Sequence, residues 1–231
     1  MADGTAMNLA RRRELARQLL DGYVHGPAAS TEATAQALTK VEDAATIVFV
    51  EGISDQIALE TVALRFERDL LAEGIVVLPI GGAHALARYA RQFGPLGAGV
   101  RLAGLCDAAE EEVYRRGLTE AEVGAARTTV ELEQLGFFVC VEDLEDEFVR
   151  AIGPQRVEEL FDSQGDLGSF RTLQTQPAWR GREVGDQMRR FFGSGSRRKL
   201  RYARLLAESV EMDKMPYPLE GLLDTLERPP R

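Results

Sequence analysis

The chain has few cysteines, and those it has do not fit a zinc site. Cys106 and Cys140 are the only two in 231 residues, and they lack the close CxxC spacing of zinc ligands. Both lie inside apolar runs of the β type, where a cysteine usually behaves as a small buried hydrophobic residue. We therefore expect reduced thiols in the core and no zinc.

Long apolar runs and the nucleotide-binding motif of ATPases are also missing. No run approaches the length of a membrane span, and the N-terminal residues MADGTAMNLARRREL include arginines but no apolar signal core. The sequence thus predicts a cytoplasmic protein with no membrane partner. The phosphate-binding pattern GxxxxGKS or GxxxxGKT is absent, so any coupling to ATP has to come from another chain.

What remains is a globular composition with an uneven distribution of charge. Hydrophobic residues make up 45% of the chain and charged residues 28%, which suits one cored domain with a helical extension. The net charge of −9 argues against a nucleic-acid partner, because Lys and Arg dominate the affinity for phosphate backbones. Residues 180–204, however, contain nine Lys or Arg and only two acidic residues, a net +7. This segment is either a phosphate-binding surface or an ordinary solvated helix face.

Three apolar runs end in residues that are suited to a ligand site. Thr46–Val50 is followed by Glu51 and, four residues after that, by Asp55. Residues 74–82 (GIVVLPIGG) end in a glycine pair, and residues 99–107 (GVRLAGLCD) end in an aspartate. Because open α/β sheets bind ligands at the carboxyl ends of their strands, we expect these ends to form one acidic edge.

Apolar periodicity and Gly/Pro punctuation predict alternating strands and helices, followed by helices alone. The alternation implies a parallel sheet with right-handed crossovers, and hence the α/β class. The expected strands are 46–50, 74–80, 99–106 and 137–141. The expected helices are 8–20, 33–41, 54–71, 84–93, 119–135, 143–152, 154–163, 183–192, 196–210 and 219–227, with an irregular connector over 165–181.

The order of these signatures resembles a TOPRIM (topoisomerase-primase) domain. It runs from Val50-Glu51-Gly52 with Asp55, through a strand closing in Gly81-Gly82, to a strand closing in Asp107. Further along, residues 137–150 (FFVCVEDLEDEFVR) and the lysine of the run SRRK at 196–199 resemble the OLD (overcoming lysogenization defect) nucleases. The likeness spans most of the chain, but this sequence has no counterpart of the ATPase domain of those nucleases. It implies a TOPRIM-type parallel sheet flanked by helices, with helical N- and C-terminal extensions.

The resemblance implies metal-dependent cleavage of nucleic acid and assigns roles to particular residues. Glu51, Asp55, Asp107 and Glu145 would hold Mg²⁺ or Mn²⁺, and Glu51 could also act as a general acid or base. Lys199 would be the catalytic cation that stabilises charge on the phosphate in the transition state. Hard divalent ions prefer oxygen ligands, and a pair of them can activate water and neutralise the phosphate.

One carboxylate that the family leads us to expect is missing. The usual Asp-x-Asp after the third strand is Asp107-Ala108-Ala109 here. Either Glu110 or Glu111 reaches back, or an ion is held by fewer side chains and more water, or the site has decayed. At least two of the glutamates at 110–112 are expected simply to begin the next helix.

Neighbouring residues have a structural interpretation beside the functional one. Asp143 would cap the following helix, with Glu145 in its first turn; the resemblance favours Glu145 over Glu142 as a ligand. The pair Gly81-Gly82 would allow close approach of a phosphate, or would form only a tight turn. His84 lies near the same edge and receives no catalytic role.

These interpretations give three segments and two main classes of function. We expect a helical extension at 1–44, a TOPRIM domain at 45–153 and a C-terminal helical region at 154–231. The preferred function is a divalent-metal-dependent DNA endonuclease or nickase that hydrolyses phosphodiesters. The alternative is a non-catalytic DNA-binding or regulatory TOPRIM subunit that partners a separate ATPase. Nucleotidyl transfer of the primase kind is a third interpretation, but the chain is too short for further primase modules. The candidate partners are DNA, that ATPase and a second copy of the chain in a homodimer.

Overall fold

The computed structural model describes residues 29–227, and its centre is the predicted parallel sheet. The strands are β1 Thr46–Val50, β2 Ile75–Pro79, β3 Arg101–Asp107 and β4 Phe137–Cys140, in the order β2-β1-β3-β4. Every neighbouring pair is parallel. All residues of β1 and β2 are buried, as expected for strands that helices cover on both faces. The predicted α/β class is confirmed.

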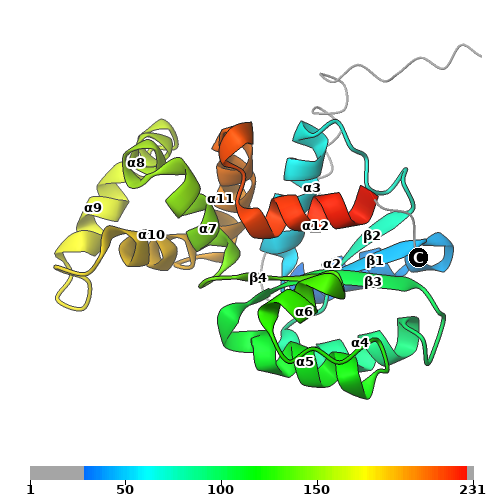
Figure 1. Cartoon of the computed structure of the whole chain (residues 1–231). Helices are drawn as coiled ribbons and strands as arrows, with labels where there is room; N and C mark the ends of the chain where they lie inside the picture. The colour runs from blue at the N-terminus through cyan, green and yellow to red at the C-terminus, as the bar shows by residue number, and fades with distance from the viewer. Residues whose placement is uncertain (1–28, 228–231) are drawn as a thin grey trace, which may run out of the picture.

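Alternate residues along each strand enter two separate hydrophobic cores. In β1, Val48 and Val50 join one core, whereas Ile47 and Phe49 join the other, because successive side chains of a strand point to opposite faces. Figure 1 shows the resulting layers, with α3, α11 and α12 on one side of the sheet and α4, α5 and α6 on the other. The free cysteines Cys106 and Cys140 are buried, one in each core.

Helices connect the strands and then continue alone to the end of the described chain. Their bounds are α2 Ala29–Leu38, α3 Ile53–Arg65, α4 Leu86–Phe93, α5 Glu111–Glu120, α6 Thr129–Gln134, α7 Leu144–Ile152, α8 Pro154–Ser163, α9 Leu167–Thr175, α10 Val184–Phe192, α11 Ser196–Ser209 and α12 Tyr217–Glu227. Short 3-10 turns are η1 Val41–Asp43, η2 Ala83–Ala85, η3 Ala108–Glu110 and η4 Met212–Lys214. The predicted helix 8–20 lies outside the described residues.

The helices after β4 form a lobe that is joined to the sheet through α11 and α12. The core of the lobe is aromatic: Phe161 contacts four other rings, those of Phe170, Phe191, Phe192 and Tyr202, at centroid distances of 4.8 to 5.6 Å. Helix α11 packs along α3, and the Arg65 guanidinium donates to the carbonyl of Ala207 at 2.6 Å. Helix α11, which carries the later part of the basic segment, lies between the lobe and the sheet (Figure 1).

Several predicted elements were wrong in their extent, including the helix expected at 54–71, which ends at Arg65. The single helix expected at 119–135 is two helices, α5 and α6, separated by a turn in which Glu122 adopts a positive φ of 56°. Thr128 and Glu131 begin α6 with a capping box, a signal that the sequence did contain. The connector expected at 165–181 includes α9, which forms because it can bury Phe170 and Leu173 against the lobe.

Candidate active site at the acidic edge

Five acidic side chains follow the carboxyl ends of three neighbouring strands. We call this set the acidic edge: Glu51 and Asp55 after β1, Asp107 at the end of β3, and Asp143 and Glu145 after β4. The edge exists because the strands are parallel, so that their carboxyl ends meet at one side of the sheet. The structure therefore brings together residues that are far apart in the sequence.

The segment after β1 holds its two carboxylates in a fixed turn. Asp55 lies at the third position of α3 and accepts a hydrogen bond from the backbone N–H of Gly52 at 2.9 Å. The carbonyl of Glu51 accepts from the N–H groups of Gly81 and Gly82, at 2.9 and 3.3 Å. Both glycines have positive φ, 74° and 111°, which other residues rarely adopt. This glycine pair is thus a turn that anchors the Glu51 backbone.

The three glutamates after β3 differ sharply in their partners. The Glu111 carboxylate is bound by the guanidinium of Arg115 and by the hydroxyl of Thr129, the latter at 2.8 Å. Glu112 is 67% exposed and lies 3.9 Å from Arg115. Within residues 29–227, the Glu110 side chain makes no hydrogen bond or ion pair and is partly buried. As expected for at least two of them, Glu111 and Glu112 begin the next helix.

At the start of α7, one carboxylate is engaged and the other is enclosed. Asp143 is the N-cap: it accepts from the backbone N–H of Asp146 at 2.8 Å and from Arg189 at 2.9 Å. Glu145 is only 7% exposed, and its Oε1 lies 3.4 Å from Nζ of Lys199. The structural interpretation of Asp143 is confirmed, and the structure brings Lys199 to the acidic edge.

The carboxylates at the edge oppose one another's ionisation. Burial, followed by the charges of Asp55 and Glu51, raises the pKa of Asp107 to about 8. Burial and then the charge of Glu110 raise the pKa of Glu51, and burial raises that of Asp55. Uncompensated negative charge of this kind is typical of sites that bind cations or carry out proton transfer.

In the ion pair of Glu145 and Lys199, the carboxylate is buried and the lysine side chain is partly exposed to solvent. Burial raises the pKa of the Glu145 carboxyl, and the ammonium of Lys199 only partly offsets this rise. Burial alone would lower the pKa of Lys199, but the negative charges of Glu145 and Asp55 outweigh it and leave that pKa raised. Lys199, whose side chain is 45% exposed, therefore keeps its positive charge at neutral pH.

The donor set at the edge suits a hard divalent cation. Every candidate ligand is a carboxylate oxygen, which Mg²⁺ and Mn²⁺ prefer. Oε1 of Glu145 is buried and, apart from its ion pair with Lys199, accepts no hydrogen bond from the residues that the structure describes. In the conformation that the structure describes for residues 29–227, however, no three His, Cys, Asp or Glu side chains are close enough together to hold a metal ion. Binding would have to draw the carboxylates inward.

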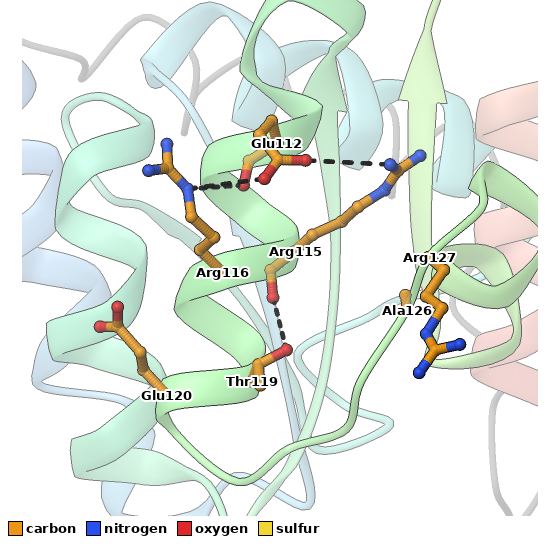
Figure 2. Close-up of a pocket in the computed structure, with 7 residues that line it drawn as sticks. All are labelled: Glu112, Arg115, Arg116, Thr119, Glu120, Ala126 and Arg127. Carbon is orange, nitrogen blue, oxygen red and sulfur yellow. Dashed lines mark hydrogen bonds and ion pairs between the residues drawn. The ribbon is translucent and has the colours of Figure 1, made fainter.

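A depression of about 440 Å³ lies beside α5, away from the predicted site residues. Figure 2 shows that Arg115, Arg116 and Glu120 approach it from α5, whereas Arg127 comes from the segment before α6. Arg115 and Arg116 are already close to the Glu112 carboxylate, at 3.9 and 3.7 Å. Because its charges are mixed and largely paired, we do not assign the site to this depression.

The basic segment 180–204 is partly neutralised within the protein. On α11, the partly exposed Arg198 and Arg201 pair with the carboxylate of Asp166, which also accepts from the hydroxyl of Tyr202 at 2.9 Å. Arg189 is held by Asp143. Sequence reasoning missed these pairs, because each joins residues far apart in the chain and no local pattern announces them.

Residues 44–108 match the sequence profile of the TOPRIM domain of overcoming lysogenization defect protein-like proteins. This chain carries an OLD-like TOPRIM domain. The match includes Glu51, Asp55 and Asp107, whereas Glu145 and Lys199 lie beyond it. Proteins of this family act on nucleic acids, and TOPRIM domains in general bind divalent metals. No helix within residues 29–227 is long and apolar enough to cross a membrane.

Solved structures of OLD proteins share the fold of most of the chain. The C-terminal region of the Xanthomonas campestris pv. campestris OLD protein is 23% identical, with a TM-score of 0.58 over 79% of this chain and 94% of that one. The C-terminal region of the Burkholderia pseudomallei OLD protein is 20% identical, with a TM-score of 0.58 over 79% and 97%. No curated protein matches the sequence. At this level of identity the likeness concerns the fold alone.

Proposed function

We propose that this OLD-like TOPRIM protein is a divalent-metal-dependent DNA endonuclease or nickase. The observation that carries the proposal is the acidic edge itself, where carboxylates from three strand ends raise one another's pKa beside the cation of Lys199. A purely structural cluster would be neutralised by partners. This one has more carboxyl groups than cations, so their ionisation is opposed until a bound cation balances their charge.

The chain's own residues divide into those that would hold the metal and one that would face the phosphate. Glu51, Asp55, Asp107 and Glu145 would hold Mg²⁺ or Mn²⁺. The chemistry that a pair of such ions supplies in phosphodiester hydrolysis is activation of water and relief of charge on the phosphate oxygens. Asp143 is excluded from the set by its engagement with Arg189 and the α7 backbone.

Lys199 has the properties of a transition-state cation. Its ammonium lies at the acidic edge, remains protonated because its pKa is raised, and is still 45% exposed to an incoming substrate. A fixed positive charge at that position would stabilise the negative charge that develops on the phosphate during cleavage. Glu51 could also transfer a proton, because burial raises its pKa toward neutral pH.

DNA binding would rely on cations that the protein itself leaves available. Within the described residues, the side chains of Arg190 and Arg197 are exposed and make no hydrogen bond or ion pair. Arg190 directly follows Arg189, which reaches the acidic edge, and Arg197 lies in the same first turn of α11 as Lys199. From α10 and α11, these two arginines could contact the phosphate backbone of a DNA strand that passes the acidic edge.

A plasmid-nicking assay tests this function directly. Purified wild type with Mg²⁺ or Mn²⁺ should convert supercoiled plasmid to open circles, and chelation should stop the conversion. Glu51→Ala should lower the rate by about 100-fold or more, because a metal site supplies several kcal/mol of barrier lowering. Glu159→Ala, at an exposed position on α8, is the matched control and should cut like wild type. Equal rates for Glu51→Ala and wild type would show that the acidic edge is not the active site.

A non-catalytic DNA-binding or regulatory subunit is the second candidate. Ala109 in place of an expected carboxylate and the open spacing of the acidic side chains within residues 29–227 favour it. Such a subunit would pair with a separate ATPase. Retention of DNA on the wild-type protein without any nicking, at several metal concentrations, would support this candidate over the nuclease.

We also propose the division into a helical extension at 1–44, a TOPRIM domain at 45–153 and a helical region at 154–231. Because α11 packs along α3 and α12 packs on β4, the last region should fold together with the TOPRIM domain rather than alone. A homodimer and an ATPase partner are further proposals. Light scattering of the purified chain would decide the first, and co-purification with the partner would decide the second.

A further inference from the structure

The segment after β3 presents three consecutive glutamates where an aspartate is missing. Asp107 ends the strand, and the two residues that follow it, Ala108 and Ala109, are short and exposed. The turn η3 then ends at Glu110, which directly precedes α5. A longer side chain near this point could reach the edge that Ala109 does not reach.

Contacts separate the three glutamates into two that are occupied and one that is available. Glu111 is bound by Arg115 and Thr129, so turning it toward the edge would break both interactions. Glu112 is mostly exposed and shares Arg115 and Arg116. Within residues 29–227, Glu110 has no competing partner.

The sheet places Glu110 at the same edge as Glu51, because β1 and β3 are adjacent strands and η3 follows directly from Asp107 at the end of β3. After burial, the charge of Glu110 is the largest influence that raises the pKa of Glu51, ahead of the charges from Glu145 and Asp143. The neighbouring position follows from the sheet, in which β1 and β3 are hydrogen-bonded partners.

We propose that Glu110 supplies the carboxylate missing at Ala109 and is a metal ligand of this chain. The inference rests on the proposed function, since it concerns the divalent ion that the acidic edge would hold. The competing explanation is that Glu110 only favours the start of α5, because a negative charge near a helix N-terminus is stabilising. That role would affect thermal stability but not metal affinity.

Metal affinity measured without catalysis separates the two explanations. Mn²⁺ binding to the full chain would be titrated by calorimetry and by the loss of the free Mn²⁺ resonance signal, for wild type, Glu110→Gln and Glu112→Gln. Glu110→Gln should weaken Mn²⁺ binding by about 10-fold or more, since even residues that merely support a ligand commonly contribute that much. Glu112→Gln, two residues away and exposed, should bind like wild type.

A double variant checks that the weaker binding reflects a missing ligand and not a damaged fold. Ala109→Asp introduced into Glu110→Gln should recover most of the Mn²⁺ affinity, because it returns one carboxylate to the same segment. Thermal melting should show that all variants are folded. Wild-type affinity in Glu110→Gln, or no recovery in the folded double variant, would overturn the proposal. If wild type itself binds no Mn²⁺, both this proposal and the proposed metal-dependent function fail, whereas a loss confined to nicking would leave this proposal standing.

Discussion

Two clusters of charged side chains in this molecule are built in opposite ways. At Asp166 a single, mostly buried carboxylate meets Arg198, Arg201 and the hydroxyl of Tyr202, so its negative charge is compensated within the lobe. At the acidic edge several carboxylates share the cation of Lys199, and their ionisation is opposed. A cluster whose charges compensate one another stabilises the fold. A cluster with more carboxyl groups than cations is stabilised only when it binds an external cation.

The largest effect that we predict is a difference in DNA cleavage rate between variants of two α11 cations. Lys199 belongs to the acidic edge, and Arg201 belongs to the cluster at Asp166. Lys199→Ala should lower the rate of DNA cleavage at saturating substrate by about 100-fold to 1,000-fold, because it removes charge stabilisation that acts mainly in the transition state. Arg201→Ala should leave that rate nearly unchanged and lower the melting temperature instead. Single-turnover nicking and thermal melting of both variants provide the measurement. Cleavage at the wild-type rate by Lys199→Ala would make that lysine a surface charge like its neighbours.

Removal of a carboxylate should have opposite consequences for stability in the two clusters. Asp166→Ala should lower the free energy of unfolding by about 2 kcal/mol, because Arg198 and Arg201 lose their charged acceptor. Asp107→Asn should instead raise the melting temperature of the metal-free protein at neutral pH by about 2–4 °C, because a neutral amide removes the cost of taking up a proton or holding a charge among the other carboxyls. Glu158→Ala, which breaks an ion pair with Arg171 on the surface of the same lobe, is the control and should cost less than about 1 kcal/mol. Destabilisation by Asp107→Asn in the absence of metal would contradict the comparison.

The stability of the metal-free protein should fall as the pH rises. The unfolded pKa of an aspartate is about 3.9, and that of folded Asp107 is about 8. Below about pH 4 both states are protonated; between the two values the unfolded state loses its proton more readily, so unfolding becomes progressively easier. Melting in chelator from pH 5 to pH 8 should show this decline, which Asp107→Asn should flatten. A stability that rises over this range would show that the Asp107 carboxylate is compensated.

The strands could be predicted from the sequence because their cause is local. A run such as Thr46–Val50 is short, apolar without alternation and rich in β-branched residues, which suits a strand buried on both faces. The same logic placed Glu51, Asp55 and Asp107 at one edge. Helix ends were harder: the run at 119–135 appears continuous unless the capping box at Thr128 is given more weight than periodicity.

Pairings between distant segments could not be predicted from the sequence. Nothing near Arg189 indicates that it meets Asp143, and nothing near Asp166 marks it as the partner of α11. These interactions depend on how the lobe packs against the sheet, and they decide how much of the +7 of residues 180–204 remains for DNA. The family resemblance, and not any local pattern, brought Lys199 forward.

The smallest predicted effect is on the salt dependence of DNA binding, and it concerns Arg190 and Arg197, which belong to neither cluster. Salt dependence of DNA binding counts released counterions, so removing one cation that touches a phosphate should flatten the slope of log affinity against log salt by about 0.9. Arg190→Ala and Arg197→Ala should each flatten it by about that amount, since neither side chain has a partner within residues 29–227. Arg198→Ala should change the slope little, because this guanidinium lies over the Phe191 ring at 4.2 Å and faces Asp166. Fluorescence anisotropy of a labelled duplex across a salt series supplies the slopes.

If Arg198→Ala flattens the slope as much as Arg197→Ala does, DNA displaces the internal ion pairs of the basic segment. The cluster at Asp166 would then be part of the DNA-binding surface.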